Sequence, residues 1–243
     1  MGEACGLSVV LPAYMEEENL RLLLPRITRT LEAMGISWEV IVVDTAVPFD
    51  KTAEVCRLHG CECVPRQGGD NFGDAVRTGI ARSAGEFVIF MDADGSHPPE
   101  FLADLWQHRG AGDVVVASRY VPGGATENPR LLVWMSRMLN VSYSTLLGLE
   151  CRDVSNSFKL YRGMDLRGLD LVCDHFDIIE EILYKLRQRN PALRIREIPF
   201  TFKKRMFGET KRNLLAFIIS YAYTMIRLRC LKSARPAGND RGA

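Results

Sequence analysis

The sequence predicts an α/β fold, a Rossmann-like, mainly parallel sheet flanked by helices. Short apolar runs rich in β-branched residues alternate with longer segments of helical periodicity through the first half of the chain, which is the pattern of successive βαβ units. The 243 residues are 47% hydrophobic and 25% charged, so the chain can bury one large core, and we predict one domain over residues 1–230. This composition excludes disordered, collagen-like and coiled-coil chains.

Strands and helices alternate in the first half. The predicted strands are Leu7–Leu11, Val40–Val43, Cys61–Pro65, Phe87–Met91 and Asp113–Ser118. The predicted helices are Glu16–Met34, Thr52–His59, Asp70–Ser83 and Pro98–His108. Gly35 is suited to end the first helix, and Pro25 inside it predicts a kink near Arg21, because proline removes a backbone hydrogen bond. Pro98 and Pro99 suit the first turn of the last of these helices.

The second half is mainly helical, and we expect it to pack on the sheet as an elaboration. Its helical stretches are Arg130–Leu147, Phe176–Arg189 and Lys211–Arg229, and its two strand-like runs are Ser157–Tyr161 and Arg194–Phe200. The last segment, 231–243, is small, polar and broken by Pro236 and Gly238. Segments of this composition at a chain end are usually disordered, so we predict a disordered tail.

Charge and targeting features narrow the class of protein. The 31 Lys and Arg nearly balance the 30 Asp and Glu, for a net charge of +1, so the chain lacks the basic excess of a general nucleic-acid binder. The seven cysteines form no regular framework and are expected to be reduced thiols. The N-terminus has no signal-peptide pattern, so we expect a cytoplasmic protein whose mature chain starts at residue 1.

One uncharged run bears on membrane contact. Leu214–Ile226 has 13 uncharged residues, which is short of the ~20 that a spanning helix requires. Basic residues follow it, so one interpretation is an amphipathic helix within 214–232 that rests on the cytoplasmic membrane face. The other is a core helix packed on the sheet, because core helices show the same apolar stripe.

The most informative segment is the Asp-x-Asp turn in FVIFMDADGSHPPE at 87–100. Ligands of open α/β sheets bind outside the carboxyl ends of the strands, and Asp92 and Asp94 follow a predicted strand there. Two carboxylates can converge on one Mg²⁺ or Mn²⁺ ion, which prefers oxygen ligands and shares them with a substrate phosphate. The segment therefore predicts a site for a nucleotide diphosphate. The alternative is a solvated acidic turn that caps the next helix.

Six motifs occur in order along the chain: SVVLPAYMEEENL (8–20), VIVVD (40–44), NFGDAVRTGIARSAGEFVIFMDADGSHPPEFL (71–102), VVVASRY (114–120), DVSNSFKLYR (153–162) and EIPFTFKKRMFGETK (197–211). Together they resemble the inverting family 2 glycosyltransferases of the GT-A fold, and most closely the dolichol-phosphate and polyprenyl-phosphate mannosyltransferases. The resemblance covers nearly the whole chain. It implies a metal-dependent enzyme that moves a sugar from a nucleotide-diphosphate donor to a polyprenyl phosphate.

The resemblance also implies site residues. The residues expected to bind the donor nucleotide are Pro12, Tyr14, Glu16, Asp44 and Asp92. Those expected to hold the metal and the diphosphate are Asp92, Asp94 and Ser96. The phosphates of donor and acceptor are expected to contact Arg119, Arg137, Arg205 and Lys211. Guanidinium groups suit that task, because two phosphorylated substrates repel each other and bidentate contacts reduce the repulsion. Surface ion pairing is the alternative for Arg119 and Arg137, and a solvated face is the alternative for the basic run 203–205.

The acceptor decides whether a general base is required. A phosphate monoester has a second pKa near ~6 and is largely anionic at neutral pH, whereas a hydroxyl acceptor benefits from a positioned carboxylate. Asp153 is the best candidate for such a base by its place in DVSNSFKLYR, and a helix-capping acid or one paired with Arg152 is the alternative. The predicted catalytic residues are therefore Asp94, Asp153 and Arg119.

The loop at 44–52, DTAVPFDKT, departs from the family pattern. Relatives usually carry two aspartates and then Gly-Ser-x-Asp-Gly-Thr, whereas this loop lacks the second acid and the glycines. The donor is left open among GDP-mannose, UDP-glucose and UDP-N-acetylglucosamine. Two alternative functions stay open: transfer to a hydroxyl of a small molecule, nucleoside or natural product, and a degenerate domain that binds a nucleotide sugar without catalysis. The four histidines lack ligand spacing, and His97 alone is near the predicted site.

Overall fold

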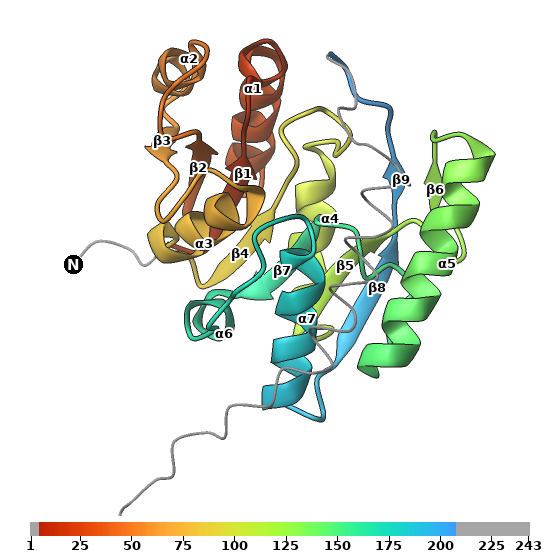
Figure 1. The fold of residues 1–243 in the computed structure, drawn as a ribbon. Helices are drawn as coiled ribbons and strands as arrows, with labels where there is room; N and C mark the ends of the chain where they lie inside the picture. Colours follow the sequence, from red (N-terminus) through yellow and green to blue (C-terminus); the bar gives the residue numbers. More distant parts are fainter. Residues whose placement is uncertain (1–4, 208–243) are drawn as a thin grey trace, which may run out of the picture.

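A mainly parallel sheet of seven strands forms the centre of the fold (Figure 1). The structure is a computed structural model, and residues 5–207 are described. The strands are β1 (Leu7–Pro12), β2 (Trp38–Asp44), β3 (Glu62–Pro65), β4 (Phe87–Phe90), β5 (Val114–Ser118), β7 (Lys159–Arg162) and β8 (Ile195–Pro199), in the order β3-β2-β1-β4-β7-β5-β8. Two short strands, β6 (Ala125–Thr126) and β9 (Thr201–Phe202), form a separate parallel ladder. The predicted α/β fold class is confirmed.

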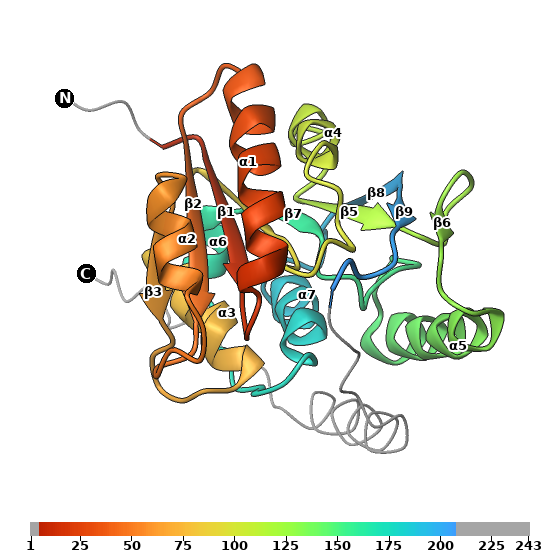
Figure 2. The same ribbon diagram turned by 90° about the horizontal axis from the view of Figure 1, so that it is seen from above.

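Helices cover both faces of the sheet (Figure 2). One layer contains α1 (Glu17–Ala33), α2 (Thr52–Leu58) and α4 (Phe101–Gln107), and the other contains α3 (Phe72–Arg82), α5 (Arg130–Leu147), α6 (Gly163–Arg167) and α7 (Ile178–Arg189). Strand β1 shows why: Val9 packs with the first layer and Val10 with the second, because successive strand side chains point to opposite faces. Strands buried on both faces are therefore continuous apolar runs.

The predicted elements of residues 5–207 are found, with small differences at their ends. Helix α1 continues through Pro25 without interruption. Helix α4 begins at Phe101 rather than at Pro98, because Pro98 and Pro99 form turns whose carbonyls accept the N–H groups of Phe101 and Leu102 at 3.1 and 3.0 Å. The sequence did not predict α6, β6 and β9. The predicted helix at 211–229, the segment 214–232 and the tail at 231–243 lie outside the described residues.

Within the part of the chain that the structure describes, we find no helix with the length and apolarity needed to span a membrane.

The direction of β7 determines which segments meet at the site. This strand pairs antiparallel with both of its neighbours, β4 and β5, so Lys159 lies opposite Phe90 on one side and Val116 on the other. The other strands of the sheet run parallel to one another. Residues just before β7 therefore lie at the edge of the sheet where the parallel strands have their carboxyl ends. That edge collects the ends of β1, β2, β4 and β5 together with residues 153–157.

Candidate functional site

Two carboxylates follow β4 at the carboxyl edge of the sheet. Asp94 Oδ1 accepts hydrogen bonds from the backbone N–H and the hydroxyl of Ser96, at 3.0 and 2.6 Å. Asp92 Oδ1 accepts one from the hydroxyl of Ser157 at 2.8 Å. The side chains of Asp92 and Asp94 remain 29% and 22% exposed. Each carboxylate is thus held through one oxygen while its group stays open to a ligand, and Ser96 uses its buried hydroxyl to hold Asp94.

The acidic turn packs against the segment that follows β9. Lys203 N–H donates to the carbonyl of Ser96, and Met206 N–H donates to that of Asp94, both at 3.0 Å. Gly95 has a left-handed backbone with φ of +83°, and a Cβ there would lie 2.6 Å from Cγ of Met206. The turn therefore requires glycine for its conformation and for this close approach.

Arg205 connects the acidic turn to the loop after β1. Its guanidinium hydrogen-bonds Glu16, and Nη1 lies 3.8 Å from Oδ2 of Asp94. Glu16 also accepts a hydrogen bond from the amide of Asn19 at 2.5 Å. Burial raises the pKa of Glu16, although Asn19 and Arg205 act against that rise. The Arg205 guanidinium thus lies between the carboxylates of Glu16 and Asp94, which come from separate loops.

Arg119 and Asp153 form a buried ion pair on the other side of the site. Arg119 donates three hydrogen bonds to the carboxylate: from Nη2 at 2.6 Å, and from Nε and the backbone N–H at 2.8 Å. The side chains are 10% and 0% exposed. Burial disfavours the charge of Arg119, but the Asp153 carboxylate outweighs it and raises the pKa of Arg119 above its usual value. The partner of Asp153 is therefore Arg119 and not Arg152.

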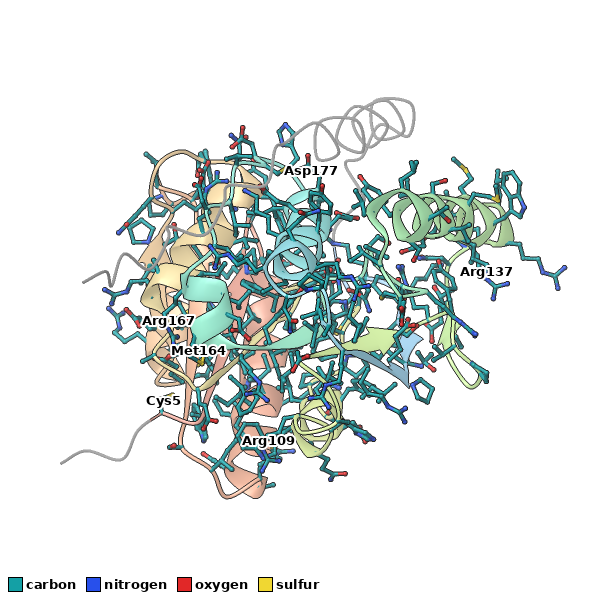
Figure 3. All side chains as sticks on the ribbon, turned by 90° about the horizontal axis from the view of Figure 1, so that it is seen from below. Cys5, Arg109, Arg137, Met164, Arg167 and Asp177 are labelled. Atoms are coloured by element: carbon teal, nitrogen blue, oxygen red, sulfur yellow. The ribbon has the colours of Figure 1, made fainter. Side chains whose placement is uncertain are left out.

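Arg137 reaches the same region from α5, on the side of the molecule away from α1 and α3 (Figure 3). The ring of Tyr120 contacts two guanidinium groups, because Cζ of Arg119 lies 5.0 Å and Cζ of Arg137 lies 5.3 Å from the ring centroid. Arg137 and Arg152 also line a cavity of about 420 Å³ beside Tyr120. Two of the predicted basic residues are thus brought together. The sequence analysis did not identify Tyr120 as their contact, although it follows Arg119 in the motif VVVASRY.

His97 ties the acidic turn to the segment before β7. Its Nδ1 accepts the backbone N–H of Asp92 at 3.0 Å, so Nε2 carries the proton that Asn156 Oδ1 accepts at 3.2 Å. Asn156 in turn donates to the carbonyl of Ala117 at 2.6 Å, and the histidine ring stacks on Phe158. Complete burial lowers the pKa of His97. A solitary histidine without ligand spacing gives no sequence signal for this role.

The remaining predicted residues lie at the ends of β1 and β2. Pro12 ends β1, Asp44 ends β2, and the two strands pair in parallel. The buried Asp44 carboxylate accepts the N–H of Thr45 at 2.8 Å, and burial raises the pKa of Asp44. Tyr14 is exposed and meets Phe49 edge to face, with the ring centroids 5.8 Å apart. Lys211 lies outside the described residues.

The acidic turn fits a hard divalent cation. Asp92 and Asp94 supply carboxylate oxygens from one turn, and Mg²⁺ is commonly bound by one or two carboxylates together with substrate phosphates. Between residues 5 and 207 there is no group of three or more His, Cys, Asp or Glu side chains that could hold a metal ion. The remaining coordination positions of such an ion suit a substrate phosphate and water.

Known proteins with similar sequences identify the family. The Glycosyl transferase family 2 domain matches residues 8–170. The dolichol-phosphate mannosyltransferase of Pyrococcus furiosus is 31% identical over 84% of this chain, and the chain spans 58% of that protein's length. The undecaprenyl-phosphate mannosyltransferase of Micrococcus luteus is 32% identical over 84% of this chain and 86% of its own. These matches define a family of glycosyltransferases. The chain belongs to Glycosyl transferase family 2.

Solved structures agree with the GT-A-like fold. Glucosyl-3-phosphoglycerate synthase from Mycobacterium tuberculosis, crystallised with Mn²⁺, UDP and glucosyl-3-phosphoglycerate, gives a TM-score of 0.70 at 20% identity, over 93% of this chain and 80% of that one. Its complex with Mn²⁺, UDP and phosphoglyceric acid gives 0.72 at 18% identity, over 95% and 80%. At these identities the likeness concerns the fold alone.

Proposed function

We propose that this protein transfers a sugar from a nucleotide-diphosphate donor to a polyprenyl phosphate, with inversion at the anomeric carbon and with Mg²⁺ or Mn²⁺ held by Asp92 and Asp94. One observation carries the proposal. The partly exposed carboxylates of Asp92 and Asp94 lie at the same edge of the sheet as the guanidinium of Arg119, which Asp153 holds in place. The first suits a metal-bound diphosphate and the second a phosphate acceptor. Relatives named for dolichol, polyprenol and undecaprenyl phosphates support the acceptor class.

On the donor side, the chain's own residues hold the carboxylates in place. Ser96 and Ser157 each occupy one carboxylate oxygen, of Asp94 and Asp92, so that the turn keeps its shape when a diphosphate binds. A bound cation would neutralise the leaving diphosphate as a Lewis acid. Arg205, next to Asp94, adds a positive charge that suits the same phosphates.

On the acceptor side, Arg119 and Arg137 supply charge rather than base catalysis. The phosphate of a polyprenyl phosphate is already largely anionic, so it can attack without losing a proton to the enzyme. Asp153 accepts three hydrogen bonds from Arg119 and is fully buried, so we assign it the role of positioning Arg119. Because Arg119 already occupies the Asp153 carboxylate, this carboxylate is poorly placed to act as a general base. This favours a phosphate acceptor over a hydroxyl acceptor. A polyprenyl acceptor also places the reaction at a membrane surface.

The donor site is tested by titration calorimetry with UDP and GDP, each with Mn²⁺ or with EDTA. Wild type is expected to bind one of them with Mn²⁺ and to lose most of this affinity in EDTA. Asp94→Ala should abolish the metal-dependent part, whereas Asp104→Ala, an exposed aspartate of α4, should bind like wild type. Equal affinity in Mn²⁺ and EDTA would contradict the metal site.

The acceptor is tested by offering GDP-mannose, UDP-glucose and UDP-N-acetylglucosamine with a polyprenyl phosphate or with the corresponding polyprenol in detergent. Product is expected with the phosphate only. Transfer to the polyprenol or to another hydroxyl would support the hydroxyl alternative. Tight nucleotide binding without transfer to any acceptor would support the degenerate domain.

A further inference from the structure

We propose that the buried Lys159 is a positioning residue, which holds the linking turn (residues 153–157) in the shape that both sides of the site require. The proposal rests on the proposed function and deepens it, because it adds a residue on which the placement of Arg119 and Asp92 depends. Lys159 is fully buried and would touch neither substrate nor metal. It acts through backbone carbonyl groups of the linking turn.

The linking turn connects the two sides of the site through its odd-numbered residues. Asp153 accepts three hydrogen bonds from Arg119, and Ser155 accepts one from the same guanidinium at 3.2 Å. Two residues further on, the hydroxyl of Ser157 donates to Oδ1 of Asp92 at 2.8 Å. A shift of the backbone in this turn would therefore move the supports of the guanidinium and of the acidic turn together.

The ammonium of Lys159 binds the linking turn from inside the protein. Its Nζ donates to the carbonyl of Val154 at 2.9 Å and to the carbonyl of Asn156. Both of these residues are buried, and a buried backbone carbonyl requires a hydrogen-bond donor. An ammonium group has three donors on a flexible stem, so it can satisfy two carbonyls at once. The lysine thus fixes the backbone while the odd-numbered side chains contact the site.

The direction of the Lys159 side chain follows from the strand that carries it. Lys159 and Tyr161 lie on the same face of β7, because strand side chains two positions apart share a face. Tyr161 packs in the layer that contains α7, and α7 contributes the fully buried Glu180. The carboxylate of Glu180 acts on the charge of Lys159. Glu180 thus gives Lys159 a buried countercharge, separate from the carboxylate that holds Arg119.

Several groups act on the buried charge of Lys159. Burial lowers the pKa of Lys159. The neighbouring groups that oppose this shift are Cys151, Glu180 and Asp153, and Arg119 adds to it. Burial raises the pKa of the Cys151 thiol, so the negative charge comes from the carboxylates. A buried charge that loses its partner is strongly destabilising, and removal of the Lys159 ammonium alone would leave Glu180 in that state.

Three variants test the proposal. Lys159→Met keeps the length of the side chain and removes its donors, Lys159→Arg keeps the charge and the donors, and Lys159→Met combined with Glu180→Gln removes both charges. For each variant we would measure the melting temperature, the hydrogen exchange of the linking turn, and kcat for transfer to a polyprenyl phosphate from the donor that wild type accepts. Lys185→Met is the matched control, because this ammonium contacts Glu181 and the carbonyl of Asp170 instead.

Lys159→Met is expected to lower the melting temperature and to reduce kcat by about 100-fold, as when one preorganised donor is removed from a site. The double variant should regain most of the melting temperature, because no buried charge is left without a partner, but it should not regain kcat. In both proteins the linking turn should exchange faster than in wild type. Lys159→Arg should retain most of kcat, and Lys185→Met should match wild type in kcat and in exchange.

The outcomes separate this proposal from the function beneath it. If kcat recovers with the melting temperature in the double variant, Lys159 acts through stability alone and the proposal is overturned. Unchanged exchange of the linking turn in the double variant would overturn it as well, even if Lys159→Met alone does not fold. If wild type transfers no sugar to any acceptor, the proposed function fails, and the exchange measurement still decides whether Lys159 holds the turn.

Discussion

Arg119 and Asp153 join the end of β5 to the segment before β7 through a buried, bidentate ion pair, with Nη2 2.6 Å from Oδ1 and Nε 2.8 Å from Oδ2. The two residues are 34 positions apart in the sequence. The carboxylate leaves the guanidinium one orientation, and Ser155 accepts a further hydrogen bond from Nη2 at 3.2 Å. Because one charge without the other would be buried and uncompensated, the pair contributes to stability, and it also fixes the orientation of Arg119 at the side of the site that we propose for the acceptor.

Replacing Asp153 by asparagine should therefore impair transfer far more than donor binding. The amide keeps the size of the side chain but offers Arg119 a single neutral oxygen, so the guanidinium loses its fixed orientation. We expect kcat to fall by about 100-fold or more, as when one preorganised donor is removed from a site. The donor Kd, measured by calorimetry with Mn²⁺, should stay close to that of wild type.

Two controls separate positioning from base catalysis by Asp153. A positioning role predicts that the residual activity of Asp153→Asn keeps the pH profile of wild type, whereas a base role predicts that its acid limb disappears. A double-mutant cycle with Arg119→Ala should show strong non-additivity, because each change already removes the function of the pair. Additive losses would contradict the coupling.

The hydroxyl of Ser96 should influence metal affinity through Asp94. Its hydrogen bond fixes Oδ1 of that carboxylate, and loss of such a supporting contact typically weakens metal binding by about 10-fold or more. We expect Ser96→Ala to raise the Mn²⁺ concentration for half-maximal activity by about 10-fold. The control is Ser142→Ala, whose hydroxyl donates to the carbonyl of Met138 on α5. An unchanged Mn²⁺ requirement in Ser96→Ala would contradict this link.

Arg205 should lower the affinity for the metal ion and raise the affinity for the nucleotide diphosphate. Its guanidinium lies 3.8 Å from Oδ2 of Asp94, so it competes with a cation for that carboxylate but attracts the phosphates of a donor. Arg205→Ala is expected to bind Mn²⁺ alone more tightly and the nucleotide diphosphate more weakly, by several-fold in each case, as measured by calorimetry. Lys203→Ala, which removes a surface pair with Glu127, should change neither. A shift of both affinities in the same direction would refute the competition.

Much of the fold could be predicted from the sequence because its elements have strong local signals. Helix α5 has the predicted bounds of 130–147, since Pro129 precedes its apolar periodicity and Gly148 follows in the left-handed conformation at φ of +64°. Strands β6 and β9 have two residues each, which is too short for any periodicity. The direction of β7 depends on pairing with distant strands, and a buried apolar run looks the same in either direction.

The site was predictable as a set of residue types but not as a set of contacts. Asp92 and Asp94 follow a strand, so their place at the sheet edge could be inferred from local sequence. The pairing of Asp153 with Arg119 could not, because it depends on the antiparallel direction of β7. The contact of His97 with Asn156 could not be predicted either, because Asn156 lies 59 positions away in the segment before β7.

The buried carboxylate of Asp44 should reduce stability at neutral pH. Burial raises its pKa in the native state above the ordinary value of 3.8, so the native state binds this proton more tightly than the unfolded state does. The free energy of unfolding therefore falls as pH rises from 3.8 through the native pKa. Asp44→Asn removes the charge and keeps an acceptor for the N–H of Thr45. At pH 7 its melting temperature should exceed that of wild type, by about 2–4 °C for each kcal/mol recovered.

Thermal denaturation from pH 7 downward should show this difference shrink and vanish below 3.8. Asp104→Asn, on the exposed side of α4, should show no such trend, and a lower melting temperature of Asp44→Asn at pH 7 would mean that the carboxylate stabilises the loop through its contacts more than its burial costs.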